Sequence, residues 1–483
     1  MERVKKMKKK TLAFGIAAGL FAIALSGCGS TGKVKLDPKN PVNIDIWHYY
    51  SGNQQNALDN MIKEFNSTVG LEEGIVVSAQ NCGSIPELSE KVLDTANKKV
   101  GTSDMPSIFL GYTNTVYEID KKGLVANLDD YLSKEELEQY DPAYIEEGRM
   151  GEKNELKIFP TAKSTEMMML NKTDWDKFAA ETGADIQELD TMEGLIDVSE
   201  QYYNWSGGKA FFGRDAMANY MLIGTRQLGT EIFKVENGKV QFQLDKEVMK
   251  KIWDGYYVPY IKGYFGAYGK FRSDDAKVGD ILAFVGSTTS ATYFPKEVFI
   301  DDSNSYPVTA MALKAPVFDG GEKYAVQQGA GMAVTKSTPE KEFASVEFMK
   351  WFTDTDRNMG FSIESGYLPV KKEAKTSEKL KSTLDTYEDG KIDSVMKETL
   401  DIAFEMSDTY KFYTAKAFEG SEEARDVLEY SLSDKAKEDK QAIDALIKNG
   451  TDREEAIAKY NTQENFEAWL SQLTKELEAT QAS

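Results

Sequence analysis

Aromatic, hydroxyl and amide side chains follow several short apolar runs of this sequence, and they are its best candidates for chemistry. An aromatic ring has an apolar face, whereas hydroxyl and amide groups both donate and accept hydrogen bonds. That combination suits a sugar, which has C–H faces and a rim of hydroxyls. Taken singly, each residue fits equally well as an ordinary turn residue or a half-buried aromatic. The set comprises Trp47, His48, Tyr49, Tyr112, Thr113, Asn114, Ser164, Thr165, Ser287, Thr288, Thr289 and Tyr367.

Residue types for nucleophilic catalysis and metal binding are scarce. One histidine, His48, and two cysteines exclude HExxH and the Cys/His zinc patterns. No calcium loop, phosphate-binding Gly-Lys-Ser/Thr run or Gly-x-Ser-x-Gly elbow occurs, and "GAGMAV" departs from the dinucleotide fingerprint at Val334. The 79 acidic residues could include a pair of carboxylates for glycoside hydrolysis, so this activity stays an alternative, but no motif points to two particular residues. We expect no metal, no cofactor and no catalytic site.

The beginning of the chain has the pattern of an export signal. A basic head, "MERVKKMKKK", precedes an apolar run that ends at Leu25, shorter than the roughly 20 residues of a membrane span. Leu25-Ser26-Gly27-Cys28 resembles the bacterial lipobox, in which cleavage precedes a cysteine that takes a lipid. We therefore expect a signal peptide over 1–27, lipidation of Cys28 and a polar tether over 28–41. The alternative is a signal peptide beside an incidental Cys28.

Composition predicts a globular and strongly acidic protein. The chain has 483 residues, 41% of them hydrophobic, which is enough for two or three lobes with their own cores. The net charge is −21, and it becomes about −26 without residues 1–27, which hold six basic residues and Glu2. Nucleic-acid binding needs basic residues against phosphates, so this balance argues against it. Electrostatic adsorption to anionic lipid is disfavoured too, which leaves membrane attachment to the lipid. With Cys28 acylated, Cys82 has no disulfide partner, and we expect a packed thiol there.

Five elements must position the first of these loops. Strand patterns over 42–50, 74–80 and 106–112 alternate with helical patterns over 51–70 and 86–99. This order predicts an open, largely parallel α/β sheet. Ligands of such sheets bind beyond the carboxyl ends of the strands, here "WHYYSG", "SAQNCGS" and "LGYTNT".

The rest of the chain is also mixed. We expect a crossing marked by Pro160, a strand over Met167 to Leu170 and helices from about 174 to 228. Residues 278–294 predict a strand, a Gly-Ser-Thr loop and a helix start, and 306–318 and 324–336 read as strands. Helices dominate from Lys341. The final one carries an apolar stripe that we expect to face the core: Phe466, Trp469, Leu470, Leu473 and Leu477.

Several stretches together resemble a known family. In order, they are the lipobox, "IDIWHYYSG", "MPSIFLGYTNTVYEIDKKGLVANLDDYL", "IFPTAKSTEMMMLNKTDW", "VGSTTSATYF", "QQGAGMAVTKSTPEKEFASVEFMKWFTD" and "SGYLPVKKEA". They are similar to family 1 extracellular solute-binding proteins of bacterial ABC importers, which include maltose-, oligosaccharide- and glycerol-3-phosphate-binding members. The similarity spans essentially residues 42 to 480.

The resemblance implies an α/β, two-lobed periplasmic-binding-protein-like fold with a hinge, an interlobe ligand cleft and a helix-rich C-terminal part. The N-terminal lobe would hold 42–159 and about 307–355, and the C-terminal lobe 160–306 and about 356–483. Hinge candidates are the crossing near Pro160 and the strands around 306–335. The partners implied are a small-molecule carbohydrate, a membrane permease and its cytoplasmic ATPase. The protein would be a lipid-anchored monomer on the outer face of the cytoplasmic membrane, and not an enzyme.

The resemblance also nominates ligand-binding residues position by position. They are Trp47 and His48 in the first-strand loop, Tyr112, Ser164, Tyr220 in the second lobe, Ser287, Gly329 and Tyr367, beside Asn114 from the strand-end set. Phosphate-ester binders would call for a tyrosine near Ile85 and a glutamate near Asn114, both absent. They would also call for an arginine near 411–425, where Arg425 and Lys411 are the candidates. A neutral saccharide is therefore favoured. Glycerol-3-phosphate or another polyol, a surface enzyme acting on glycans, and a structural or adhesive lipoprotein remain alternatives.

Overall fold

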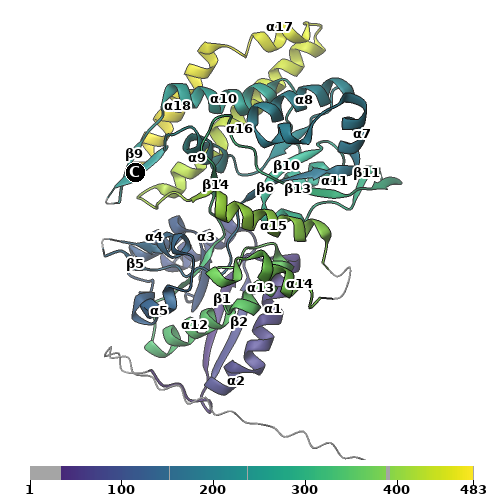
Figure 1. Ribbon diagram of the computed structural model, residues 1–483. Coiled ribbons are helices and arrows are strands. Elements are labelled where there is room, and N and C mark those ends of the chain that lie inside the picture. The colour runs from purple at the N-terminus through teal and green to yellow at the C-terminus, as the bar shows by residue number, and fades with distance from the viewer. Residues whose placement is uncertain (1–33, 152, 237, 388–391, 482–483) are drawn as a thin grey trace, which may run out of the picture. The chain divides into compact units, whose positions relative to one another are not determined.

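The structure is a computed structural model that describes residues 34–151, 153–236, 238–387 and 392–481. The predicted signal peptide and Cys28 lie outside these residues. Figure 1 shows the arrangement of the elements.

The first sheet has the strand order β15-β3-β1-β2. Its strands are β1 (Val42–His48), β2 (Ile75–Asn81), β3 (Ile108–Gly111) and β15 (Gly331–Val334). β1 is parallel to β2 and β3, and β15 is antiparallel to β3. The predicted, largely parallel α/β sheet is therefore confirmed. The helices of this part are α1 (Gly52–Ser67), α2 (Val69–Glu73), α3 (Ile85–Ala96), α4 (Thr113–Asp120), α5 (Lys134–Leu137), α6 (Pro142–Glu147), α12 (Pro339–Phe352) and α13 (Thr355–Ser365).

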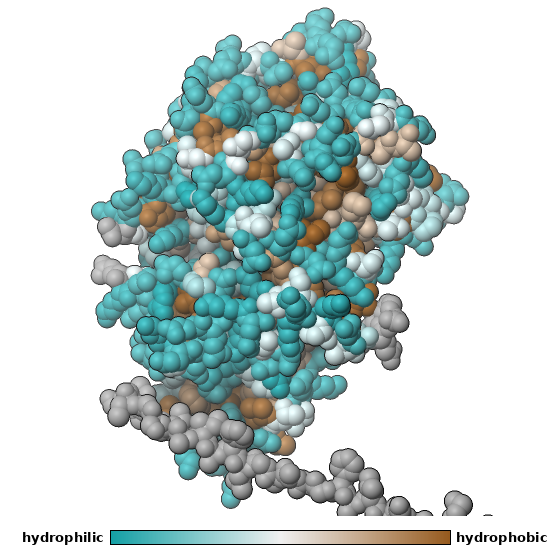
Figure 2. All heavy atoms as spheres, viewed as in Figure 1, coloured by the Kyte–Doolittle hydropathy of each residue, from teal (hydrophilic) through white to brown (hydrophobic). Residues whose placement is uncertain are grey.

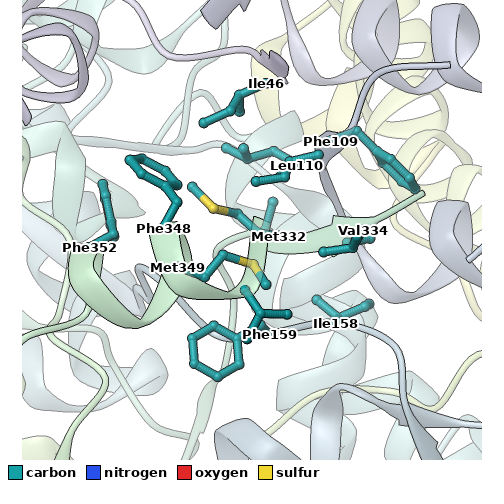
Figure 3. Close-up of a cluster of buried hydrophobic side chains, with 14 of the residues drawn as sticks. Ile46, Phe109, Leu110, Ile158, Phe159, Met332, Val334, Phe348, Met349 and Phe352 are labelled. Atoms are coloured by element: carbon teal, nitrogen blue, oxygen red, sulfur yellow. The ribbon is translucent and has the colours of Figure 1, made fainter. Parts of the chain in front are cut away.

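A first hydrophobic core lies between this sheet and α12. Figure 3 shows Met332 of β15 among Leu110 of β3 and the side chains of Phe348 and Met349 from α12. All four are at most 2% exposed. Each fully buried side chain of this size contributes about 1.5–3 kcal/mol, so the sheet and α12 hold each other in place.

The second sheet has the order β13-β6-β10-β7. β6 pairs antiparallel with both β10 and β13, whereas β10 and β7 are parallel. Its strands are β6 (Glu166–Asn171), β7 (Phe212–Arg214), β10 (Ala283–Ser287) and β13 (Ala310–Lys314). The helices packed around it and in the adjoining cores are α7 (Lys172–Thr182), α8 (Met192–Ser206), α9 (Met217–Gln227), α10 (Lys246–Ile261), α11 (Arg272–Lys277), α14 (Ser377–Leu384), α15 (Ser394–Thr409), α16 (Ser421–Lys448), α17 (Arg453–Ala458) and α18 (Gln463–Ala479).

Short two-stranded pairs complete the fold. They are β4 (Arg149–Met150) with β5 (Glu155–Leu156), β8 (Phe233–Glu236) with β9 (Lys239–Phe242), β11 (Glu297–Asp301) with β12 (Asn304–Pro307), and β14 (Tyr324–Val326) with β16 (Lys411–Tyr413). The last pair joins segments far apart in the sequence, in parallel.

The predicted elements differ from the structure in two places. The helical stretch from 174 to 228 is interrupted by β7, which is too short to show a strand pattern. The expected helix start after Gly286 is a 3₁₀ turn over Thr288–Thr292. The stripe of the last helix is confirmed, because Phe466, Trp469, Leu473 and Leu477 are buried and Leu470 packs against the same core.

Two segments pack with a different sheet or core from the one that the expected lobe boundaries imply. β13, within the segment expected in the first lobe from about 307, pairs with β6 of the second sheet. Phe361, Tyr367 and Val370, expected in the second lobe, belong to the first core. The reason is the packing of α13 beside α1, visible in Figure 1, which carries the first core past residue 355.

The face of the molecule shown in Figure 2 is covered mainly by hydrophilic residues, with hydrophobic ones scattered among them. This distribution fits the strongly acidic composition. Within the described ranges, no helix combines the length and the apolar composition needed to cross a bilayer.

Candidate functional site

Three tyrosines from three separate segments meet at the carboxyl edge of the first sheet. Tyr49 follows β1, Tyr112 caps the start of α4 after β3, and Tyr367 follows α13. The hydroxyl oxygens of Tyr49 and Tyr367 are 3.3 Å apart, and the Tyr49 hydroxyl also contacts that of Tyr112. We call these three residues the tyrosine cluster.

Burial raises the pKa of all three tyrosines well above its ordinary value, and charge interactions with neighbouring tyrosines add to the rise. The hydroxyls therefore stay protonated, and each can both donate and accept a hydrogen bond. Rings with neutral hydroxyl tips are the groups expected for a sugar.

The chain segments 163–166 and 327–329 run side by side next to this cluster. Ser164 and Gln328 exchange two backbone hydrogen bonds, of 2.8 and 3.1 Å. The Lys163 ammonium donates to both carboxylate oxygens of Glu147, at 2.8 and 2.9 Å, and to the carbonyl of Gly329 at 2.8 Å. The cation is thus neutralised by its own carboxylate and is held in place rather than left free.

A buried polar network continues from this crossing into the second sheet. Glu166, at the start of β6, accepts hydrogen bonds from Arg214 at 2.7 Å and from Asn219 at 2.9 Å. The Asn219 amide also donates to Gln328 at 3.0 Å, and its carbonyl accepts from Arg425 at 2.7 Å. The network therefore joins β6, β7, α9 and α16 to the crossing.

Arg425 is the cation of this network that has no carboxylate of its own. Among the described residues it forms no ion pair within 4 Å, and its charge works against the burial-driven rise in the pKa of Tyr112. Half-buried beside the tyrosine cluster, its guanidinium has donors to spare for a ligand. The family resemblance pointed to Arg425 or Lys411 for such a residue.

The loop after β10 approaches the same place. Ser287 pairs with Glu166 in the sheet, and its hydroxyl lies 2.6 Å from that of Thr289. Gly366, just before Tyr367, has φ +77°, and a Cβ there would lie 2.8 Å from Cα of Thr289. This close approach requires glycine and brings the Tyr367 loop against the Ser287 loop.

The structure thus brings together Tyr112, Ser164, Ser287, Gly329 and Tyr367, and it places the other predicted residues differently. Trp47 and His48 are core residues, 3% and 1% exposed. The Nδ1 atom of His48 accepts the Tyr50 N–H at 3.1 Å, and burial lowers the pKa of His48. Its ring is therefore neutral and already engaged.

Tyr220 and Asn114 also lie apart from the tyrosine cluster. Tyr220 is buried in α9, where its hydroxyl donates to the carbonyl of Ile252 at 2.8 Å. It lines a cavity of about 30 Å³ together with Glu166 and Arg214, which is space for little more than a water molecule. Asn114 is half-buried in the first turn of α4, and its side chain makes no hydrogen bond within the described ranges. Their role as ligand contacts stays a prediction.

The close crossing makes Gly329 a sensitive position. Its φ is +99°, and a Cβ there would lie 2.6 Å from the Ala162 carbonyl oxygen. We expect Gly329→Ala to lower the free energy of unfolding by at least about 2 kcal/mol, because backbone strain and a steric clash add. Gly320→Ala is the matched control, since Gly320 has φ +69° but open space around it. Equal losses in urea unfolding would contradict a clash at the crossing.

Asp215 provides a pH-dependent prediction. Burial raises its pKa to about 6, although Arg272 opposes the rise. An acid whose pKa is raised by folding holds its proton more tightly in the folded state, so stability falls as the pH rises from about 4 to about 6. Asp215→Asn should remove this loss. The side chain is 32% exposed, so screening limits the expected gain at pH 7.5 to about 1–2 kcal/mol.

Urea unfolding at pH 4 and pH 7.5 checks this prediction. Asp301→Asn is the control, because hydrogen bonds from Asn304 and Ser303 lower the pKa of that exposed carboxyl. Asp301→Asn should bring no gain at pH 7.5. The prediction would be contradicted if the difference in free energy of unfolding between the wild type and Asp215→Asn were the same at both pH values.

Comparison with known proteins identifies the class. Residues 60–386 match the family of bacterial extracellular solute-binding proteins, and the chain belongs to this family. No curated protein matches the sequence.

Solved structures agree on the fold, which is the two-domain periplasmic-binding-protein-like fold predicted above. The cyclic α-maltosyl-1,6-maltose binding protein from Arthrobacter globiformis matches with a TM-score of 0.65 and 17% identity, over 91% of this chain and 99% of that chain. UgpB from Mycobacterium tuberculosis in complex with glycerophosphocholine matches with a TM-score of 0.66 and 16% identity, over 90% of this chain and 99% of that chain. MalE from Bdellovibrio bacteriovorus bound to maltotriose matches with a TM-score of 0.58 and 14% identity, over 90% of this chain and 100% of that chain.

Proposed function

We propose that this protein is the receptor of a bacterial ABC importer and that it binds a neutral mono- or oligosaccharide at the tyrosine cluster. The observation that carries the proposal is the meeting of Tyr49, Tyr112 and Tyr367, with protonated hydroxyls, beside the amides of Asn219 and Gln328. Of the similar proteins, one is a cyclic α-maltosyl-1,6-maltose binding protein and another is bound to maltotriose, which supports the same ligand class.

Delivery would follow from closure of the two domains around the sugar. The antiparallel bridges Phe159↔Met332, Ser164↔Gln328 and Lys163↔Leu368 tie the crossing segments together and are the proposed hinge. The first domain would then hold residues 42–159 and about 328–370, because Val370 still belongs to the first core. A ligand that binds the closed state better shifts the population towards it, and the permease reads that state.

The proposed setting is the outer face of the cytoplasmic membrane. Lipidation of Cys28 would anchor a monomeric receptor there, beside a permease and its cytoplasmic ATPase. Mass spectrometry of the exported protein tests the anchor: a diacylglyceryl adduct on Cys28 is expected, and an unmodified cysteine would contradict it.

A second candidate ligand is a phosphate ester. Arg425 favours it, because a half-buried guanidinium without a carboxylate partner can bind phosphate with several hydrogen bonds. The similarity to a structure in complex with glycerophosphocholine points the same way. Arg425→Gln would then abolish phosphate-ester binding, whereas a neutral sugar would lose only one hydrogen-bonding partner.

Thermal unfolding of residues 29–483 with saccharides, polyols and glycerol phosphates tests the proposal. A ligand at 100 times its dissociation constant adds about 2.7 kcal/mol to the stability, which raises the melting temperature clearly. A saccharide that raises it and is recovered intact supports the receptor. Recovery as fragments indicates a glycan-acting enzyme instead. No shift with any saccharide contradicts the proposed ligand class.

A further inference from the structure

A groove with a volume of about 970 Å³ opens next to the tyrosine cluster. Its walls are the outer face of α1, the end of α13, the start of α15 and the loop segments 291–296 and 308–310. Figure 1 shows α13 and α15 as neighbours in this part of the molecule. The volume lies at the upper end of the range of about 300–1,000 Å³ that small-ligand sites occupy.

Three asparagines of α1 line this groove. Asn53, Asn56 and Asn60 follow the spacing that places residues on one helix face, opposite the buried residues Leu58 and Met61. All three are exposed, and none of their side chains makes a hydrogen bond to any residue that the structure describes. Asparagine is a weaker helix former than Ala, Glu or Lys, so α1 carries three unfavourable residues along this one wall.

The charges of the groove indicate a neutral occupant. Its lining holds two basic and two acidic side chains, Lys296, Lys397, Glu364 and Asp393. Lys296 and Asp393 form an ion pair with an N–O distance of 3.0 Å. The remaining lining alternates hydroxyls, such as Thr292 and Ser394, with apolar side chains. The Thr292 hydroxyl donates to the Thr289 carbonyl at 2.8 Å and can still accept a hydrogen bond. Amides and hydroxyls around apolar patches match a sugar better than a charged ligand.

Tyr293 lies between the groove and the tyrosine cluster. The hydroxyl of this exposed residue lies 3.4 Å from the hydroxyl of Ser51. Ser51 stands two residues after Tyr49 and two before Asn53, and Tyr293 directly precedes Phe294, another residue of the lining. Tyr293 is also close enough to Tyr367 to act on its hydroxyl. A chain-like ligand that extends from the tyrosine cluster past Tyr293 would reach the groove.

We propose that this groove is a second saccharide subsite, so that the ligand is a neutral oligosaccharide longer than a disaccharide. One end lies at the tyrosine cluster, and the asparagines of α1 hydrogen-bond the hydroxyls of the units beyond Tyr293. This inference rests on the proposed function and narrows its ligand from mono- or oligosaccharides to longer oligosaccharides.

Calorimetric titration of the purified protein tests the subsite with two series of linear sugars, α-1,4-glucans and β-1,4-xylans of two to six units. For the series that binds, we expect the affinity to rise at least tenfold from the shortest to the longest member. The triple variant Asn53→Ala, Asn56→Ala, Asn60→Ala should lose at least fivefold for the longest sugar and stay within twofold for the disaccharide. Alanine is the better helix former, so the variant should fold at least as stably.

Lys63→Ala is the matched control, because Lys63 is exposed on α1 outside the groove and should leave all affinities unchanged. Affinity that does not depend on sugar length, or a triple variant that binds the longest sugar like the wild type, overturns the subsite and leaves the proposed function standing. Binding of neither series contradicts the proposed function, and the subsite with it.

Discussion

Replacing Glu166 with alanine should lower the free energy of unfolding by about 3–5 kcal/mol, one of the largest effects of any single change in this protein. The side chains of Glu166 and Arg214 are 9% and 7% exposed, with an N–O distance of 2.7 Å. Without the carboxylate, a buried guanidinium loses its only ion pair among the described residues. Asn219 loses an acceptor at the same time, and an unpaired buried donor carries its own cost.

Urea denaturation measures this loss, and two variants serve as controls. Asp176→Ala breaks an exposed pair with Lys172, whose side chains are 56% and 38% exposed, and should change stability by no more than about 0.5 kcal/mol. The double variant Glu166→Leu, Arg214→Met should recover most of the loss, because apolar side chains of similar size need no partner. If Glu166→Ala cost no more than Asp176→Ala, the buried network would not hold the site together.

Tyr367→Ala should weaken saccharide binding at least tenfold, which is about 1.4 kcal/mol. The ring would no longer offer its face to the sugar, and stacking alone contributes about 0.5–1.5 kcal/mol beyond the buried area. Tyr367 also packs against Tyr50 and Phe361, so the variant is less stable and must be titrated well below its melting temperature.

Calorimetric titration with the sugar found by thermal unfolding checks this prediction. Tyr367→Phe keeps the ring and loses only the contact with the Tyr49 hydroxyl, so its affinity should fall less than that of Tyr367→Ala. Tyr131→Ala is the second control. Tyr131 is partly buried too, but its hydroxyl donates to Glu342 at 2.7 Å, away from the site. Affinity of Tyr367→Ala within twofold of wild type would show that Tyr367 is not a ligand contact.

The chemistry of these two predictions was visible in the sequence to different degrees. Tyr367 stands in a short loop after a helical pattern, where an aromatic side chain is a reasonable binding candidate. Glu166 stands at the start of an apolar strand and carries no local sign of its partners. Arg214 and Asn219 follow it by 48 and 53 residues, and only the pairing of β6 with β10, and of β10 with β7, brings them together.

Local sequence patterns were sufficient to predict a helix or strand wherever the element is long and has one buried face. The alternation over Val42–His48 and the apolar spacing of α1 and α18 predicted the right elements, because burial of one face repeats along the chain with the period of the element. The three-residue β7 shows no such repeat, so its strand conformation depends on its neighbour β10.

The candidate site divides in the same way. Residue types at strand ends could be selected from the sequence, because the order of strands and helices implies a parallel sheet with its ligands at one edge. Which buried side chains meet could not be selected. Trp47 and Tyr367 are both core residues, 3% and 5% exposed, yet only Tyr367, like Tyr112, brings its hydroxyl to that of Tyr49. Asn53, Asn56 and Asn60 share a helix face in any helix with this sequence. That this face lines a groove depends on the packing of α13 beside α1 and of α15 beside α13, and distances between such segments are set by the tertiary structure alone.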